Sequence, residues 1–172
     1  MNVSWFEAAA FAAWLSALGV DRIGLPDEVT WEHACRAGTT TAYWSGNDEA
    51  ALHAVGWYQD ASGGRTHAVG DLPSKRAAEH PHRIRHLHGN VREWTSSWKT
   101  PDHSMLPNDH DPSAPSDRPP AARRVFRGGT WWFAPRICRA AFRGSWSPTF
   151  REVYLGFRLV RWCSRTWSVR PA

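Results

Sequence analysis

The middle of the chain, residues 39–120, lacks the regular hydrophobic spacing of helices or strands. Gly, Pro, Asp, Ser and His are abundant there, and the segments GNDEA, ASGGRTH and PNDHDPSAPSDRPP are typical of loops. One ordered segment, LHGNVREWTSSW at residues 87–98, interrupts these loops and has short-strand character. Regular secondary structure is therefore expected mainly at the two ends of the chain.

Two helices are predicted before this irregular middle. Ser4 and Glu7 form a capping box, in which the two residues satisfy each other's free N–H groups, and Gly19 stands where a C-cap glycine belongs. Apolar residues recur between them at helical spacing: Ala8, Phe11, Ala12, Leu15 and Leu18. The second helix follows Asp27 as its N-cap and ends at Gly38, with one face formed by Trp31, Ala34 and Cys35.

The final third of the chain is predicted to be β. The segments RVFRGG, CRAAFRG and YLGFRLVRW are short and are separated by turn residues, as in an antiparallel sheet. Two helices, a long irregular middle and a late antiparallel sheet indicate an α+β fold. At 172 residues the chain is long enough for one domain with a substantial core, and no internal repeat is visible.

Twelve tryptophans stand out in an otherwise ordinary composition of 42% hydrophobic and 22% charged residues. Indole rings favour cores with polar inclusions and contact surfaces, because each ring carries one N–H group that needs a partner. The net charge is +5, but nearly all basic residues are arginines and no nucleic-acid-binding motif is present. Nucleic acid is therefore not an expected partner.

Two further classes are disfavoured by the sequence. No run of about 18 apolar residues and no signal segment occurs, which predicts a cytoplasmic protein for the chain as given; a longer N-terminus would leave export open. Cys35, Cys138 and Cys163 are odd in number and lack metal-binding spacing, so neither a disulfide framework nor a zinc site is implied. Cys35 is expected to be a small core residue on its helix.

Six short motifs in this chain occur in the order found in the formylglycine-generating enzyme family, the sulfatase-modifying-factor domain. They are Asn2-Val3-Ser4-Trp5, Leu25-Pro26 with Trp31-Glu32, His88-Gly89-Asn90-Val91 with Glu93-Trp94, Arg127-Gly128-Gly129-Thr130-Trp131, Cys138-Arg139 and Gly156-Phe157-Arg158. The resemblance implies a variant of the C-type lectin fold over residues 1–160 and leaves the tail, 161–172, unassigned.

The resemblance also indicates a missing part. Domains of the family carry a further N-terminal stretch, including a strand of the main sheet, whereas this chain starts almost on the Asn-Val-Ser-Trp motif. An unpaired sheet edge is normally covered in a native protein. A short gene model, a fragment and another element that completes the sheet are the three explanations that remain open.

A copper site is not expected. Formylglycine-generating enzymes that this chain resembles use two cysteines, five residues apart, to bind copper(I) and activate oxygen. Soft thiolates select this ion. Cys138 occupies the second position here, but Phe133 occupies the first, and a phenyl ring cannot ligate copper. Cys138 is then expected to be a buried small residue.

Calcium is the one cofactor that the resemblance leaves open. Glu93 resembles the family's calcium-binding glutamate, with the carbonyls of Gly89 and Val91 expected beside it. Calcium prefers six to eight oxygen ligands, yet His86 stands where the family has an Asn or Asp. The favoured alternative is that Glu93 accepts hydrogen bonds from backbone N–H groups of its loop.

Two groups of side chains have structural interpretations. The histidines His80, His82, His86 and His88 suggest zinc, but no cysteine or carboxylate pattern completes the site, and a solvated loop is favoured. Four arginines of the last third alternate with Trp131, Phe142 and Phe157, and are expected to stack on aromatic rings and brace loops: Arg127, Arg139, Arg143 and Arg158.

A set of positions in the last third differs from most of the family, where asparagine-rich runs are common. Here many of them are apolar or aromatic, and they are expected on the exposed face: Trp132, Phe133, Ala134, Ile137, Phe142, Gly144, Ser145, Trp146, Ser147, Glu152, Val153 and Tyr154. The pattern resembles the variable proteins of diversity-generating retroelements, and ordinary drift in a non-catalytic paralogue competes with it. An exposed apolar patch of this kind marks a contact site.

These observations favour a non-catalytic domain that binds a protein or small molecule through its aromatic residues. The main alternative is a family enzyme, an oxidase or cyclase, that acts without the copper cysteine pair. A third hypothesis is a truncated, inactive paralogue.

Overall fold

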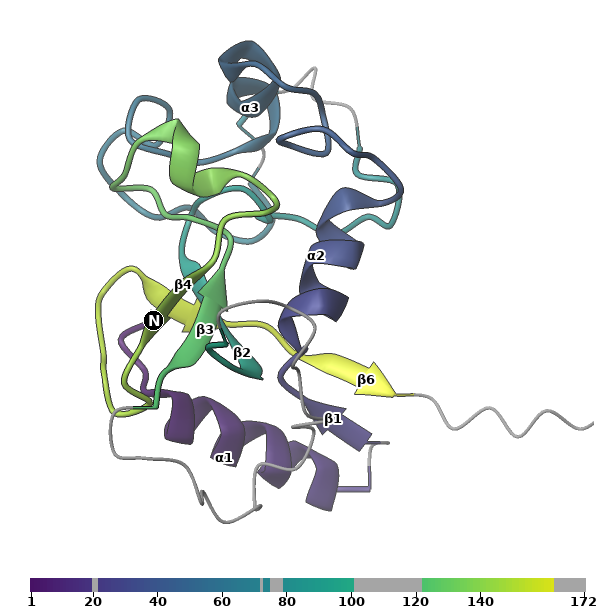
Figure 1. Cartoon of the computed structure of the whole chain (residues 1–172), viewed down its shortest axis with the longest axis vertical. Helices are drawn as coiled ribbons and strands as arrows, with labels where there is room; N and C mark the ends of the chain where they lie inside the picture. The colour runs from purple at the N-terminus through teal and green to yellow at the C-terminus, as the bar shows by residue number, and fades with distance from the viewer. Residues whose placement is uncertain (20–21, 72, 75–78, 101–121, 163–172) are drawn as a thin grey trace, which may run out of the picture.

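The computed structural model has an α+β architecture and describes residues 1–19, 22–71, 73–74, 79–100 and 122–162 (Figure 1). Its helices are α1 (Trp5–Ala17), α2 (Glu28–Arg36), α3 (Glu49–Val55) and a 3₁₀ helix, η2 (Pro135–Cys138). Its strands are β1 (Arg22–Gly24), β2 (Arg92–Trp98), β3 (Arg124–Arg127), β4 (Gly144–Trp146), β5 (Leu155–Phe157) and β6 (Val160–Trp162). The predicted loop 107–120, Cys163 and the rest of the tail lie outside the described residues.

Helix α1 begins at the predicted capping box. The Glu7 N–H donates to Ser4 Oγ at 3.3 Å, and the Ser4 N–H donates to the Glu7 carboxylate at 2.8 Å. The buried face differs from the prediction, because Phe11 and Leu18 are exposed while Trp5, Ala8, Ala9 and Ala12 are buried. Trp5 fixes which face of α1 turns toward the core, since its indole lies under the sheet and donates to the Thr95 carbonyl at 2.8 Å.

Helix α2 also agrees with its prediction. Asp27 caps it by accepting from the Thr30 N–H, and Trp31 and Cys35 are buried on one face. Helix α3 was expected to be loop. Asp48 within the GNDEA segment caps it, but the helix is too short for a hydrophobic period to be recognisable in the sequence.

The main sheet has the strand order β4-β3-β2-β5. β3 is antiparallel to both β2 and β4, whereas β5 is parallel to β2, so the sheet is mixed and not wholly antiparallel as expected. The CRAAFRG segment forms no strand: it follows η2, and its Ala140 N–H donates to the Ala42 carbonyl in a distant loop. A separate pair, β1 and β6, is antiparallel.

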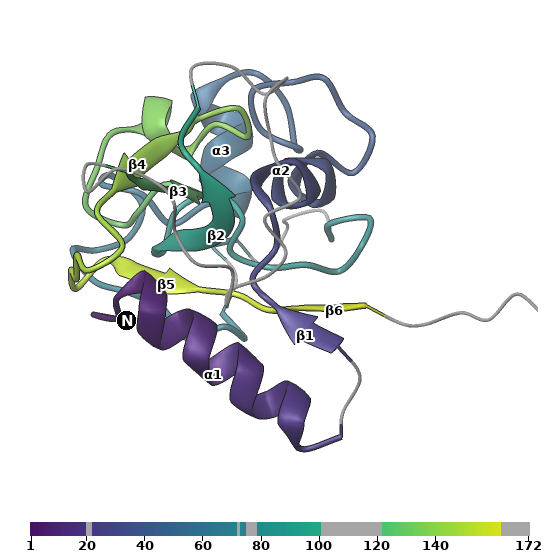
Figure 2. The ribbon, with the colours of Figure 1, turned by 60° about the horizontal axis from the view of Figure 1, so that its bottom comes forward.

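Strand β2 lies at the centre of the molecule and is covered on both faces. Trp94 packs with Trp5 of α1 and Phe126 of β3 in one buried cluster. Its neighbour Glu93 points the other way, toward Trp31 of α2, because successive side chains of a strand alternate. Helices α1 and α2 therefore lie on opposite sides of the sheet, and Figure 2 shows α1 running beneath β5. Within the described chain, none of the helices has the length and apolar character needed to cross a membrane.

Candidate functional site

Three of the four arginines that the sequence singled out form ion pairs with carboxylates. Arg143 contacts Glu28 of α2 through two bonds of 2.5 Å, and Arg127 of β3 contacts Glu32 of the same helix. Burial raises the pKa of Glu32, but the charges and hydrogen bonds of Arg127 and Arg36 together outweigh burial, so the pKa lies below its ordinary value. Carboxylates, more than aromatic rings, are thus the partners of these arginines.

These arginines also have contacts other than the two ion pairs above. Arg127 also lies over the Trp31 ring, with 5.6 Å between the guanidinium carbon and the ring centroid. Arg139 was expected to stack on an aromatic ring, but it is exposed and donates to the Arg136 carbonyl. The third ion pair joins Arg158 to Glu93 at the centre of the molecule.

Glu93 is bound on both carboxylate oxygens by protein groups. Arg158 donates to the two oxygens at 2.5 and 2.6 Å, and Trp31 Nε1 donates to Oε2 at 2.6 Å. These partners are side chains and not the backbone N–H groups that we expected. Gly89 and Val91 precede Glu93 in the turn before β2. The Nε2 atom of His86 lies 2.9 Å from the Asp71 carbonyl. A buried guanidinium at the carboxylate opposes a second cation, so these residues do not fit a calcium site.

Cys138 is fully buried at the end of η2. Burial raises the pKa of its thiol to about 12. A Cβ added to Gly129 would lie 2.5 Å from its sulfur, so the chain packs directly against it. Cys35, the other described cysteine, belongs to a different buried cluster. With Phe133 at the first position, these residues do not fit a two-thiolate copper site.

Residues 80–88 carry four histidines, and we call them the histidine segment. Most of these histidines are buried, which corrects the expectation that the segment is a solvated loop. His80, His86 and His88 are buried, and only His82 of the four is exposed. His88 Nδ1 contacts the Cys138 carbonyl at 2.7 Å, and its Nε2 accepts from the Trp44 N–H at 3.1 Å. Burial lowers the pKa of His88 to about 4. Among the described residues, no three His, Cys, Asp or Glu side chains gather to hold a metal ion.

Four aromatic rings surround the guanidinium of Arg92, the first residue of β2. Their centroids lie 4.6 to 5.2 Å from its central carbon, and they belong to Phe126, Phe133, Trp146 and Tyr154. Phe133 packs edge-on against Tyr154, and Trp146 packs against Phe126 with centroids 4.4 Å apart. We call this group the Arg92 cage. Three of its rings come from positions that the sequence assigned to the contact face.

The other predicted contact residues are placed differently. Trp132 is 57% exposed, and among the rings that the structure describes it packs edge-on against Trp131. Ile137 packs against the buried cluster around Cys138, and Phe142 against the cluster around Trp94. Ala134 is half-buried at the start of η2, and Val153 is exposed. Trp132 is thus the exposed aromatic residue of this set, and Phe133, Trp146 and Tyr154 are partly exposed; we call these four residues the aromatic face.

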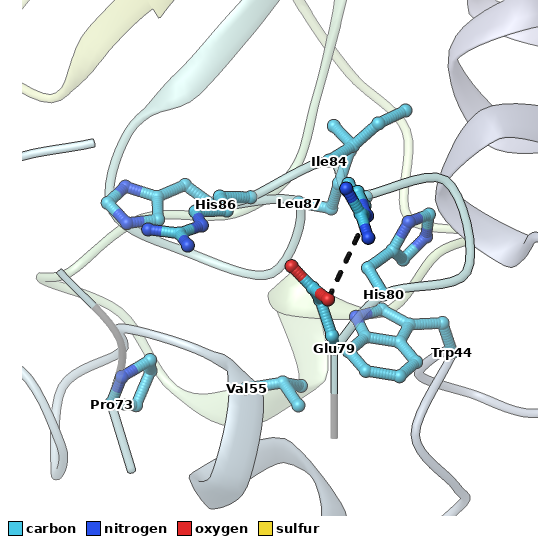
Figure 3. Close-up of a pocket in the computed structure, with 10 residues that line it drawn as sticks. Trp44, Val55, Pro73, Glu79, His80, Ile84, His86 and Leu87 are labelled. Atoms are coloured by element: carbon cyan, nitrogen blue, oxygen red, sulfur yellow. Dashed lines mark ion pairs between the residues drawn. The ribbon is translucent and has the colours of Figure 1, made fainter. Parts of the chain in front are cut away.

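A separate cavity of about 110 Å³ lies beside the histidine segment (Figure 3). Trp44 and His80 line one side and His86 the other, with Glu79 between them. The polar groups of this cavity already have protein partners. His80 Nε2 lies 3.2 Å from the Cys35 carbonyl, and Glu79 pairs with Arg83. The cavity thus presents mainly apolar surface to a ligand.

The model of the sulfatase-modifying factor enzyme 1-like domain matches residues 1–163. The chain belongs to this family. It is 35% identical to the hercynine oxygenase of Mycolicibacterium smegmatis over 168 residues, which cover 92% of this chain and 36% of the relative. It is 29% identical to the formylglycine-generating enzyme of Streptomyces coelicolor, covering 92% of this chain and 51% of the relative.

Solved structures of the family have the same fold. Treponema denticola variable protein 1 superimposes with a TM-score of 0.74 at 27% identity, over 92% of this chain and 69% of its own. PvdO from Pseudomonas aeruginosa gives 0.73 at 26% identity, over 93% and 60%. The predicted α+β fold of this family and the resemblance to a variable protein are thereby confirmed. The chain spans only about a third to a half of the curated relatives' length.

Sequence reasoning missed two features of the site. Arg92 lies inside the HGNVREW motif but was not singled out, although an arginine next to the family's glutamate on a buried strand must be enclosed on the opposite face. Glu28 and Glu32 were also missed as partners of the arginines. Their spacing of four residues puts both on one side of α2, which was the available signal.

Proposed function

We propose that this domain is a non-catalytic binding domain whose contact surface is the aromatic face. The observation that carries the proposal is the position of Phe133. Where the enzymes of the family are expected to have a copper-binding thiolate, this chain has a ring that packs with Tyr154 and encloses Arg92. Position 133 is thus part of an aromatic surface, and Cys138, at the second position of the cysteine pair, is a buried packing residue.

The exposed indole of Trp132 supports a contact role. Exposed aromatic groups lose their hydration cost when a partner covers them, and tryptophan and tyrosine are the usual hot-spot residues of interfaces. Likeness to a variable protein is consistent with this role. We extend the proposal to a partner protein or peptide, and we keep diversification of the face by a retroelement as a hypothesis that neighbouring genomic DNA can test.

An oxygenase activity is the second candidate, because the hercynine oxygenase relative is 35% identical over most of this chain. The first experiment tests one catalytic activity of the family's enzymes, the formation of formylglycine. The protein is incubated with copper, a reductant, oxygen and a Cys-x-Pro-x-Arg peptide, and the peptide mass is followed. We expect no conversion of the thiol to an aldehyde, whereas the Streptomyces coelicolor enzyme converts it. Conversion by this protein would overturn the non-catalytic proposal.

The second experiment tests binding. Peptides are selected from a displayed library on the wild-type protein, and their affinity is compared with Trp132→Ala. Truncation of an interface anchor typically costs about 2 kcal/mol or more, roughly a thirtyfold loss of affinity. Peptides that bind the variant equally well would show that this face is not the contact surface.

Unfolding measurements distinguish a tryptophan that contacts a partner from one that packs in the core. Trp132→Ala is expected to change the free energy of unfolding by less than about 1 kcal/mol, because the side chain is mostly exposed. Trp146→Ala is the matched control and should cost roughly 3 kcal/mol, because its ring packs on Phe126 and Phe150. If Trp132→Ala unfolds the protein, the residue is part of the core.

A further inference from the structure

Arg92 differs from the ion-paired arginines of the molecule. Its side chain has neither a hydrogen bond nor an ion pair among the residues that the structure describes, and its Nε is buried without a partner. Only 7% of the residue is exposed. Arg127 is fully buried and Arg143 and Arg158 are partly exposed, and each of the three has a carboxylate partner. A charge this enclosed is normally paired, because desolvation costs several kcal/mol.

The rings of the Arg92 cage compensate this charge only in part. Cation–π contacts are weaker than ion pairs, and the rings cannot accept conventional hydrogen bonds in the plane of the guanidinium. Glu152 lies in the neighbouring turn, but its Oε1 accepts from the Val153 N–H and forms no ion pair with Arg92. The guanidinium donors therefore remain available.

The cage is also accessible from outside. Phe133, Trp146 and Tyr154 are half-exposed, so the rings that enclose the guanidinium also reach solvent. Nε is the only one of its three nitrogens that is both fully enclosed and without a partner. Since the two terminal nitrogens also lack partners, they must touch solvent between the rings. A ligand oxygen can approach them there.

We infer that Arg92 is an anchoring residue for a carboxylate carried by an apolar or aromatic group. The planar fork of the guanidinium matches a carboxylate, and the surrounding rings match the apolar group beside it. The carboxylate could belong to the C-terminus of a peptide with an apolar last residue or to a free aromatic acid. This inference rests on the proposed binding role and names the chemistry that the aromatic face recognises.

The test compares acids with neutral analogues of the same shape. Binding of N-acetylphenylalanine and of N-acetylphenylalaninamide is measured by quenching of tryptophan fluorescence and by calorimetry. Phenylacetate represents the free aromatic acids. We expect the acid to bind at least about tenfold more tightly than the amide, because a charge-assisted hydrogen bond is lost in the amide. Preference for phenylacetate over N-acetylphenylalanine would assign the free acid as the source. Equal affinities of acid and amide, or no binding of either acid, would overturn the inference.

The Arg92→Met variant separates a binding role from a structural one. Methionine keeps the apolar stem inside the cage and removes the unpaired charge, so the melting temperature should stay equal or rise. The same variant should lose the preference for the acid over the amide. A variant that melts well below the wild type, or that still prefers the acid, contradicts an anchoring role.

The proposed function and this inference can fail separately. If library peptides lose affinity for Trp132→Ala but bind Arg92→Met as well as the wild type, the aromatic face is the contact surface and the carboxylate inference is wrong. If the acid depends on Arg92 while no selected peptide depends on Trp132, the anchoring role stands and the wider contact surface is wrong.

Discussion

At the scale of single residues, His88 has the most constrained environment. Its two ring nitrogens contact the Cys138 carbonyl and the Trp44 N–H, and its Nε2 lies 3.8 Å from the Cys35 sulfur. Nδ1 must carry the hydrogen, since a carbonyl only accepts, and Nε2 must stay unprotonated to accept from Trp44. The ring is therefore held neutral, and burial lowers its pKa to about 4.

This environment makes stability depend on pH. The pKa of His88 is depressed in the folded protein, so below its unfolded value of about 6.5 the unfolded chain binds a proton that the folded chain does not. The free energy of unfolding should fall by about 3 kcal/mol as the pH drops from 6.5 to 4. Burial also lowers the pKa values of His80 and His86, which act in the same direction. Urea unfolding at each pH measures the slope.

Replacement of an exposed histidine provides the control. His33→Ala should leave the pH slope unchanged, because this side chain lies on the solvent side of α2. A wild-type stability that is constant between pH 6.5 and 4 would contradict the buried, neutral state of His88.

Residue-level predictions from the sequence succeeded where a motif fixes the position. Cys138 was expected to be buried, and it is, because it follows the Gly-Gly turn at a fixed distance. The histidines were misplaced because their polarity suggested solvent, whereas neighbouring carbonyl groups satisfy them inside the protein. The partners of buried polar groups come from distant segments, and no local pattern announces them.

At the scale of secondary-structure elements, α2 is fixed to the rest of the molecule by charge. Glu28 and Glu32 lie one turn apart on this helix and pair with Arg143 and Arg127. The backbone N–H of Glu28 also donates to Ser97 Oγ of β2 at 3.0 Å. The packing of α2 against the sheet therefore depends on buried ion pairs as well as on Trp31.

Removing one partner of a buried pair should be costly. Glu28→Gln leaves Arg143 enclosed without its carboxylate, and we expect the free energy of unfolding to fall by about 3 kcal/mol or more. The double variant Glu28→Leu with Arg143→Met should recover much of this loss, because it removes both charges. Chemical denaturation measures each variant. The matched control is Arg83→Gln, which breaks an exposed pair and should cost less than about 1 kcal/mol. Equal losses of unfolding free energy in Glu28→Gln and Arg83→Gln would contradict the conclusion that buried ion pairs fix α2 to the sheet.

The elements themselves were predictable to different degrees. Helices α1 and α2 were found from their caps, which are local signals. Helix α3 and strand β1 were missed, because short elements carry too little periodicity. The parallel pairing of β2 with β5 could not be deduced either, since β3 and β4 come between these two strands in the sequence.

At the scale of the whole molecule, Glu93 joins three parts of the structure. It belongs to β2, accepts from Trp31 of α2 and pairs with Arg158, which follows β5. Burial alone would lower the pKa of Arg158, but the charge of Glu93 and its hydrogen bonds together outweigh burial and raise the pKa. Family resemblance suggested calcium at this place, whereas the side chains present supply a positive charge of their own.

We therefore expect calcium to leave the stability of this protein unchanged. A ligand that binds only the folded state adds about 2.7 kcal/mol at one hundred times its dissociation constant, which would raise the melting temperature by several degrees. Calcium would first have to displace Arg158 and leave that guanidinium without a carboxylate, a cost of several kcal/mol. The melting temperature is compared in a chelator and in micromolar to millimolar calcium. A rise of several degrees at micromolar calcium, abolished in Glu93→Gln, would instead place the ion at this carboxylate.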